Sequence, residues 1–196
     1  LRPHKAVIAN IDNDHLETYA NSFKNLKKSF RKFCLNIPFQ GKLFANGDYQ
    51  EVLEVVENLP RNISLYGFED INDLQILEFT QNKNGSHFVL FDKKNNNKMN
   101  FKTNMIGKHN VLNAAAAIAV ALDEGIPYEG IKRALEKFIV IERRFQLISE
   151  NVFEKDIILI DDYGHHPKEL LVSINTAKEV WPDREILVVF QPHRYT

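Results

Sequence analysis

The stretch "AVIANIDNDHLETYANSFKNLKKSFRKFCLNIP", Ala6 to Pro38, decides the fold class because it holds a strand and a helix in direct succession. "AVIANI" (6–11) is a short, continuous apolar run, which is typical of a parallel strand covered on both faces. The following helix should end before Pro38. Its large apolar side chains recur at spacings of three and four, which predicts one stripe against a core: Leu16, Tyr19, Phe23, Leu26, Phe30, Phe33 and Ile37.

The same alternation continues up to residue 141 and predicts an α/β domain. "LQILEF", "HFVLF" and "KMNFKT", between Leu74 and Thr103, predict a small antiparallel meander with a hairpin turn at Asn84 and Gly85. The Asn/Lys tract at 93–98 should be a solvated loop tip. Further elements are predicted at 41–46 (strand), 49–59 (helix), 62–68 (strand), 109–125 (an Ala-rich helix) and 127–138 (helix).

The composition changes at "IVIERRFQLI", and the strand and helix rhythm then returns. We therefore predict two partial domains, residues 1–141 and 142–196. The second should contain strands at 145–149, 156–161 and 185–190, with a helix from Pro167 to about Val180. Proline suits the first position of a helix, so Pro167 should fix the histidine pair before it.

The composition limits the classes of partner. Lys plus Arg (25) nearly balances Asp plus Glu (26), so we expect small-molecule partners and no nucleic acid. Cys34, the single cysteine, excludes an internal disulfide and favours the cytoplasm. The apolar run Val111 to Leu122 is too short to span a membrane, so we expect no membrane insertion. The oligomeric state is left open.

Three polar clusters follow predicted strands, where open α/β sheets bind their ligands: "NIDNDH", "DDYGHHP" and "QPHRYT". A zinc site at Asp161, Asp162, His165 and His166 is one interpretation, but it lacks an HExxH motif or a cysteine partner. A serine hydrolase would need a G-x-S-x-G turn, which is absent. Phosphate chemistry remains. The chain has no P-loop motif, so any ATP site in it would be half a site.

"NIDNDHLETY", "GKHNVLNAAAAIAVA", "ERRFQ", "DDYGHHPKEL" and "FQPHRYT", in this order, resemble the Mur ligase family. The last two motifs point to its alanine-adding branch. The resemblance implies the rear of a P-loop-type central ATPase domain, followed by the front of a Rossmann-like C-terminal domain. It also implies that the UDP-binding domain, the P-loop and an acidic magnesium motif lie upstream of Leu1.

The implied reaction is an ATP-dependent ligation in cytoplasmic peptidoglycan precursor synthesis. ATP would phosphorylate the carboxylate of UDP-N-acetylmuramate, and the amine of L-alanine would attack the acyl phosphate. Two alternatives stay open: a recycling ligase that adds a peptide to the same sugar nucleotide, and a non-catalytic nucleotide-binding module. We expect the chain alone to show no ligase activity and at most weak adenine-nucleotide binding.

The resemblance also implies roles for individual residues on the nucleotide side. Arg144 would contact the γ-phosphate, as cations must neutralise the transferring phosphoryl group. Asn110 and Asn113 would face adenine, because a carboxamide both donates and accepts, and His109 would pack on the ring. In the alternative, His109 and Asn110 only cap the helix. Asp162 would accept hydrogen bonds from the ribose.

On the substrate side, Tyr163, His165, His193 and Arg194 would face the muramate carboxylate and the incoming alanine. Arg194 suits a carboxylate because its planar fork binds two oxygens. Arg144, His165 and Arg194 are the catalytic candidates. His15 matches the position of a second magnesium, although magnesium prefers oxygen ligands and a histidine better suits manganese. The segment 139–144 is the hinge candidate, and His166 has no assigned role.

Overall fold

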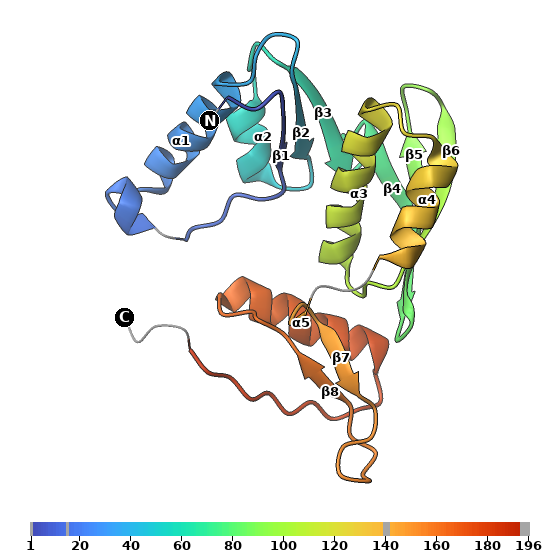
Figure 1. Ribbon diagram of the computed structural model, residues 1–196. Coiled ribbons are helices and arrows are strands. Elements are labelled where there is room, and N and C mark those ends of the chain that lie inside the picture. The colour runs from blue at the N-terminus through green and yellow to red at the C-terminus, as the bar shows by residue number, and fades with distance from the viewer. Residues whose placement is uncertain (1, 15, 139–141, 193–196) are drawn as a thin grey trace.

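The computed structural model describes residues 2–14, 16–138 and 142–192 (Figure 1). Its first part alternates strands and helices, as predicted: β1 (Lys5–Ile8), α1 (Phe23–Leu35), β2 (Lys42–Asn46), α2 (Gln50–Val56) and β3 (Asn62–Gly67). The three strands pair in parallel and in chain order. Leu43 and Ala45 pack with α1 and α2 on one face, while Phe44 packs on the other. The sheet is therefore buried on both faces, which explains the continuous apolar runs.

The long helix predicted from residue 16 is interrupted. Residues Leu16–Tyr19 form a 3-10 turn, η1, and α1 begins only at Phe23. Ala20 and Asn21 have positive φ angles of 54° and 52°, which end the first turn. Ser22 then caps α1, because its side chain accepts a hydrogen bond from the backbone N–H of Asn25. The predicted apolar stripe still faces the core across this break, and Cys34 is fully buried beside it.

The predicted meander is confirmed as β4 (Leu74–Asn82), β5 (Gly85–Asp92) and β6 (Asn97–Thr103). It joins the parallel strands through two residue pairs only, Tyr66 with Leu74 and Gly67 with Gln75. The hairpin turn consists of Lys83 and Asn84, one residue earlier than the predicted Asn84 and Gly85. Gly85 begins β5, and glycine is required there because a Cβ atom would lie 2.1 Å from the carbonyl oxygen of Thr103.

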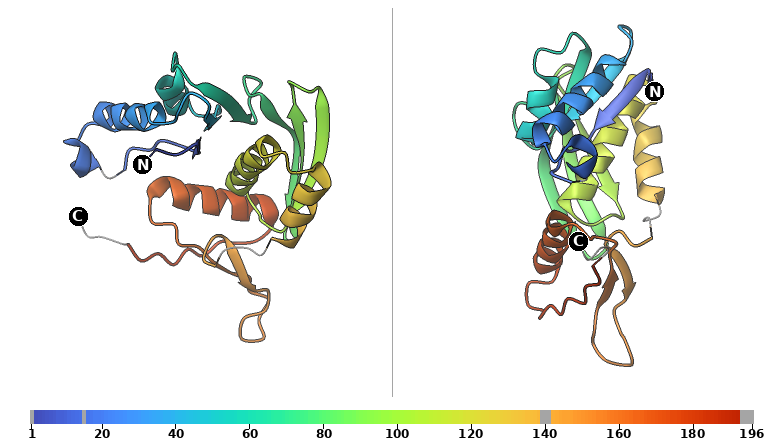
Figure 2. Two further views of the ribbon diagram at one scale, coloured as in Figure 1. Left: turned by 45° about the horizontal axis from the view of Figure 1, so that its top comes forward. Right: turned by 90° about the vertical axis from the view of Figure 1, so that its left-hand side faces the viewer.

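Two helices cover the face of the sheet opposite α1 and α2, as the two views in Figure 2 show. They are α3 (Lys108–Asp123), which packs on the central strands, and α4 (Tyr128–Lys137), which packs on β6. Gly125 has a φ of +74° and follows the C-cap of α3, as its sequence position predicts. None of the described helices has the length and apolar character needed to cross a membrane.

The C-terminal part contains β7 (Gln146–Ser149), β8 (Leu159–Asp161) and α5 (Pro167–Val180). β7 and β8 pair antiparallel. The strand predicted at 185–190 is wrong, because this segment pairs with no strand in the described part of the chain. Leu187 and Val189 are 89% and 92% exposed. An apolar run becomes a strand only where a neighbouring strand accepts its backbone hydrogen bonds.

Candidate functional site

Two of the three predicted polar clusters meet between the sheet and the C-terminal part. The loop after β1 carries Asp12, whose carboxylate binds Lys168 Nζ from the first turn of α5. Asn10 Nδ2 donates to the other oxygen of Asp12, at 2.9 Å. The hydrogen bond between Lys168 and Asp12 raises the pKa of the Lys168 ammonium. The carboxyl end of β1 therefore lies beside α5, at the edge of the sheet where open α/β folds bind their ligands.

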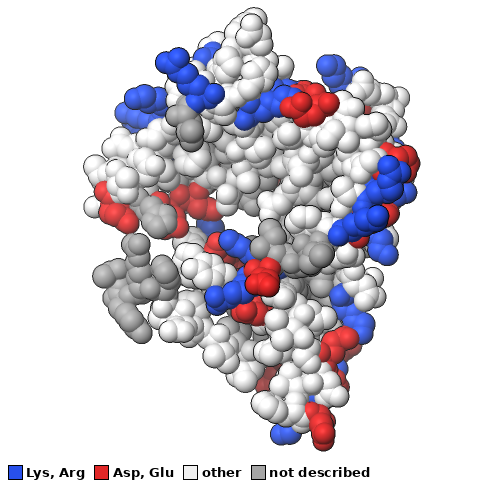
Figure 3. Space-filling model, viewed as in Figure 1, with Lys and Arg blue, Asp and Glu red and all other residues white. Residues whose placement is uncertain are grey.

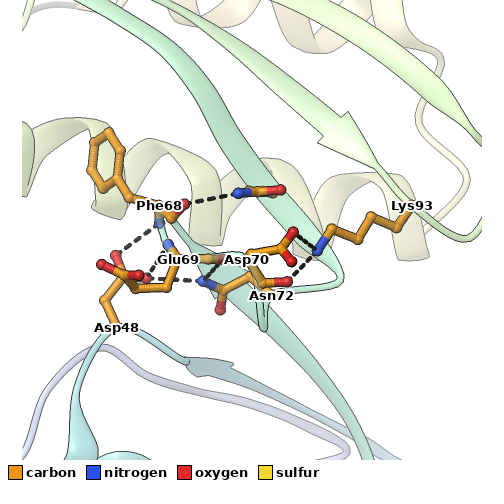
Figure 4. A network of polar contacts seen from close by, with 7 residues as sticks. Asp48, Phe68, Glu69, Asp70, Asn72 and Lys93 are labelled. Atoms are coloured by element: carbon orange, nitrogen blue, oxygen red, sulfur yellow. Dashed lines mark hydrogen bonds and ion pairs between the residues drawn. The ribbon is translucent and has the colours of Figure 1, made fainter.

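The next two strand ends are joined by Asp48, which lies just after β2 (Figure 4). Its carboxylate accepts hydrogen bonds from the backbone N–H groups of Phe68 (2.8 Å) and Glu69 (2.9 Å) and from Asn72 Nδ2 (2.8 Å). Gly67 must lack a side chain, because a Cβ atom would lie 2.2 Å from Asp48 Oδ1. Lys93 binds Asp70 beside this network. The network fixes the edge of the sheet that faces α5.

The start of α3 contacts α5 directly. Gly107 is the N-cap of α3, with a φ of +104° and no side-chain cap. A Cβ atom there would lie 2.5 Å from His109 Cε1 and 3.4 Å from Thr176 Oγ1. Thr176 belongs to α5 and is buried. The backbone of Gly107 is therefore enclosed between the imidazole and α5.

Burial and two neighbouring charged residues act on the pKa of His109. Burial lowers the pKa of its imidazole, the nearby Asp162 carboxylate raises it, and Arg144 lowers it further, with a net decrease. Its Nδ1 atom is buried and has no hydrogen-bond partner among the described residues. The three predicted nucleotide-site residues His109, Arg144 and Asp162 thus lie within reach of one another's charges, although they come from three separate motifs.

The two asparagines of α3 differ. Asn110 is buried, and its Nδ2 atom donates to the carbonyl oxygen of Ile106 at 2.8 Å. Asn113 is exposed, four residues after His109 and on the same side of the helix. Gly107, and neither His109 nor Asn110, holds the N-cap position, so the capping alternative is wrong. Asn113 is the better placed of the two to contact a ligand.

The "ERRF" segment presents its arginines through unusual backbone geometry. Arg143 and Phe145 have φ angles of +59° and +51°, which are uncommon for residues with a side chain. Phe145 turns inward and stacks on Trp181, with ring centroids 6.5 Å apart. Arg144 lies exposed between them and forms no hydrogen bond or ion pair with another described residue. Its guanidinium is available for an anion.

Asp162 holds the segment around Arg144 in place. Its Oδ2 accepts a hydrogen bond from the N–H of Phe145 (2.8 Å), and its Oδ1 accepts one from the N–H of Gly164 (2.7 Å). The N–H of Tyr163 donates to the carbonyl oxygen of Arg143 at 2.7 Å. These bonds clamp "ERRF" to "DDYG". A carboxylate oxygen can accept more than one hydrogen bond, so this clamp and the predicted ribose contact are compatible.

The remaining predicted substrate residues form a small exposed group. The ring of Tyr163 contacts His165 edge to face at a centroid distance of 5.6 Å, and Arg143 lies over its face at 5.1 Å. His166 has a structural role: it caps α5, with Nδ1 accepting from the N–H of Lys168 at 3.3 Å. Pro167 is the first residue of α5, as predicted.

Glu169 completes the cap of α5. Its Oε2 atom accepts hydrogen bonds from the N–H groups of His165 (3.0 Å) and His166 (3.2 Å). Burial raises the pKa of its carboxyl, but these two donors outweigh burial and, helped by the charges of His165 and Arg144, lower it. Asp162 and His166 thus bind backbone amides, and the zinc interpretation of this cluster receives no support.

Several predicted site residues lie outside the described residues: His15, His193 and Arg194. The same holds for residues 139–141, which include the end of the predicted first domain and half of the hinge candidate. Among the described residues, no three His, Cys, Asp or Glu side chains gather to hold a metal. The predicted metal site therefore stays a prediction.

Four residues at or beside the site were not predicted from the sequence. They are Arg143, Lys168, Glu169 and Gln81, whose side chain binds both Gly107 and Glu179 of α5. Arg143 was adjacent to the chosen Arg144, and a doublet gives no sign of which member faces a ligand. Glu169 follows His166 by three residues, the spacing of a capping box, which was a usable signal. Lys168 binds Asp12, 156 residues away in the sequence, and Gln81 binds Glu179, 98 residues away. No local sequence pattern predicts such contacts.

Figure 3 shows an indentation between the two parts of the chain, with acidic and basic side chains at its margin. A mixed margin suits ligands that carry phosphates and also need carboxylate or metal contacts.

Each of the two parts of the chain matches a known protein-family model. The family model of the Mur ligase middle domain matches residues 1–121. The model of the Mur ligase glutamate ligase domain matches residues 143–195. The chain is 40% identical over 197 residues to a UDP-N-acetylmuramate–L-alanine ligase of Psychrobacter arcticus and 42% identical over 202 residues to one of Buchnera aphidicola. Each alignment covers all of this chain and 41% of the relative, so the chain spans about two fifths of their length.

Solved structures agree with these matches. A crystal structure of a UDP-N-acetylmuramate–alanine ligase from Thermotoga maritima has a TM-score of 0.80 and 28% identity, covering 98% of this chain and 42% of that one. A murein peptide ligase from Psychrobacter arcticus has a TM-score of 0.65 and 25% identity, covering 94% of this chain and 36% of that one.

Proposed function

Because the chain belongs to the Mur ligase family, we propose that it is the ATP- and amino-acid-facing portion of a ligase that joins L-alanine to UDP-N-acetylmuramate. The reaction would serve peptidoglycan precursor synthesis in the cytoplasm. One observation carries the proposal: Asp162 accepts a hydrogen bond from the N–H of Phe145, next to Arg144, and α5, which follows Asp162, lies against Gly107 at the start of α3. Three of the five ordered motifs therefore lie next to one another.

The proposed chemistry needs cations near a transferring phosphoryl group. The carboxylate of UDP-N-acetylmuramate and ATP are both anionic, so a positive side chain must reduce their repulsion and hold them in line. Arg144 is exposed, has no ion-pair partner among the described residues and is held by the Asp162 clamp. We assign it to the γ-phosphate. Arg194 would hold a substrate carboxylate.

The nucleotide would lie along the start of α3. In this proposal His109 packs on the adenine, Asn113 faces its edge, and Asp162 accepts from the ribose. Asn110, predicted for the same edge, holds the start of α3 through its bond to Ile106. Neutral His109 suits this role because burial, the largest influence, lowers its pKa. A neutral imidazole stacks on a base without leaving a buried charge.

The substrate end of the site would involve Tyr163 and His165, which lie beside Arg143, together with His193. We propose that these groups orient the attacking amine of L-alanine. Magnesium, or manganese, would be held near His15 and would neutralise phosphate charge when bound. Asp12 and Asn10, which precede His15 in the sequence by a few residues, carry oxygen atoms that suit a hard cation.

The proposal is tested on the protein at its natural length. Phosphate release from ATP should require both UDP-N-acetylmuramate and L-alanine. The Arg144→Ala variant should lower kcat by about a hundredfold or more, as expected for a group that stabilises transition-state charge. Lys83→Ala is the matched control, because Lys83 forms an exposed ion pair with Glu150 outside the proposed site, and it should retain activity.

The recycling ligase remains the second candidate, since a murein peptide ligase shares this fold. Release of phosphate with a peptide substrate, but not with L-alanine, would move the assignment to that enzyme. Nucleotide binding without any phosphate release would instead favour a non-catalytic module.

A further inference from the structure

Gln81, at the end of β4, connects the sheet, α3 and α5 through a single side chain. Its Oε1 atom accepts a hydrogen bond from the backbone N–H of Gly107 at 2.8 Å. Its Nε2 atom donates to Glu179 Oε2 at 2.7 Å. A carboxamide is planar and its donor and acceptor move together. A shift of Glu179 therefore shifts the group that holds Gly107.

Gly107 is the point at which such a shift matters. It precedes the first turn of α3 and has no side chain to hold that turn. The His109 imidazole and Thr176 Oγ1 of α5 both lie beside the position that a Cβ atom on Gly107 would occupy. Because the imidazole lies so close to Gly107, we expect the orientation of the Gly107 peptide to affect the position of His109.

Among the described residues, the other side-chain hydrogen bonds and ion pairs between the two parts do not reach α3. Lys83 and Glu150 form an ion pair at the hairpin tip, with side chains 51% and 47% exposed, and exposed pairs contribute little to stability. Lys168 joins α5 to Asp12, in the loop after β1. Gln81 differs from both contacts because it binds Gly107, the N-cap residue of α3.

We propose that Gln81 is a positioning residue that couples the place of α5 to the affinity for the nucleotide. When Glu179 holds Gln81, the Gly107 peptide and His109 take the orientation that receives adenine. When α5 moves away, Gln81 turns and the start of α3 loosens. The inference rests on the proposed function in one respect, namely that α3 binds adenine; the link from Glu179 to Gly107 stands apart from it.

The test exchanges donor and acceptor across the contact. Gln81→Glu keeps an acceptor for the N–H of Gly107 but sets a second carboxylate against Glu179. Adding Glu179→Gln restores a donor at 179, with the direction of the bond reversed. Asn82→Asp is the matched control. It adds the same charge next door and keeps the side-chain oxygen that accepts from the N–H of Asn84.

The first measurement is steady-state kinetics of the protein at its natural length. Gln81→Glu should raise the KM for ATP by about fivefold, in the lower range of coupling between sites, with kcat within about twofold of the parent. The double variant should return KM to the parent value, and Asn82→Asp should leave it unchanged. A double variant as impaired as Gln81→Glu would overturn the proposal.

The second measurement is amide hydrogen exchange at Gly107 without nucleotide, followed by NMR. Gln81→Leu removes the acceptor and should speed exchange by about tenfold, the effect of losing one buried hydrogen bond. Glu179→Ala leaves Gln81 intact and should still speed exchange about threefold, because the carboxamide is released. Unchanged exchange in Glu179→Ala would overturn the link.

The two measurements separate the two ideas. If the parent protein shows no ATP-dependent phosphate release while Gly107 exchange responds to Glu179→Ala, the proposed function fails and the link remains. If the ligase activity is present but Gly107 is indifferent to Glu179, the link fails alone.

Discussion

Asp48 alone joins the end of β2 to the loop after β3. Its carboxylate accepts three hydrogen bonds from the loop after β3. Asp48→Ala should lower the free energy of unfolding by about 3 kcal/mol, because it leaves donors of a part-buried loop without their charged acceptor. Urea unfolding measures this. Asp70→Ala, in the same loop but with a side chain 93% exposed, should cost less than about 0.5 kcal/mol.

His109 makes stability depend on pH, and the sign follows from its pKa. Burial lowers that pKa from its ordinary value of 6.5. As the pH falls through this value, the unfolded chain takes a proton that the folded chain excludes, so the free energy of unfolding falls. His109→Gln should weaken this decrease between about pH 7.5 and about pH 5.5.

Thermal unfolding at the two pH values measures this difference. His87→Gln, which changes an exposed histidine on β5, is the control and should keep the parent dependence. An equal decrease in the His109→Gln and parent proteins would contradict the assignment.

At the residue scale, the order of the motifs predicts which residues come together, but the sequence does not predict which way each side chain points. The sequence selected His109, Arg144 and Asp162, and the fold brings their charges together. It could not separate Asn113, which faces solvent, from Asn110, which turns inward. That difference depends on how α3 packs on the sheet, which is a tertiary property.

At the scale of the element, α5 depends on a cap built from a histidine. His166 Nδ1 accepts from the N–H of Lys168, and Glu169 accepts from the N–H of His166. His166→Ala should lower the free energy of unfolding of the C-terminal part by about 1 kcal/mol, the usual contribution of an N-cap, while His166→Asn should retain most of it. Denaturant unfolding followed by Trp181 fluorescence reports on this part.

The control for the cap lies further along the same helix. Asn175 is exposed in the interior of α5, so Asn175→Ala should change stability by less than about 0.5 kcal/mol. A loss as large in Asn175→Ala as in His166→Ala would show that general helix content, and not the cap, controls α5.

Elements were predictable where the pattern was local. The parallel strands, the meander and the Ala-rich helix follow from runs of apolar residues and turn signals. The break before α1 was missed because the apolar stripe continues through Ala20 and Asn21, whose backbone leaves the helix. The strand at 185–190 was wrong because strand formation requires a partner, and apolar character alone does not provide one.

For the whole molecule, the contact between Lys168 and Asp12 should make compactness depend on salt. Their side chains are 64% and 26% exposed, so added salt screens the pair. The radius of gyration should rise between about 0.05 M and about 0.5 M salt in the parent protein, and rise less in Lys168→Gln. Small-angle scattering measures it.

Lys24→Gln is the matched control, because Lys24 is an exposed lysine on α1 with no role in this contact. It should keep the parent response to salt. Identical responses in the parent protein and in Lys168→Gln would show that other contacts hold α5 in place.

The narrow join between β3 and β4 bears on the order in which the chain acquires its structure. The meander is built from contacts between neighbours in sequence, and it meets the parallel strands at two residue pairs. Local pairings close short loops and form quickly, whereas parallel strands must wait for their crossover helices. We expect the meander to fold first. The parallel strands would then form more slowly, with Tyr66 and Gly67 of β3 pairing with the exposed edge of β4.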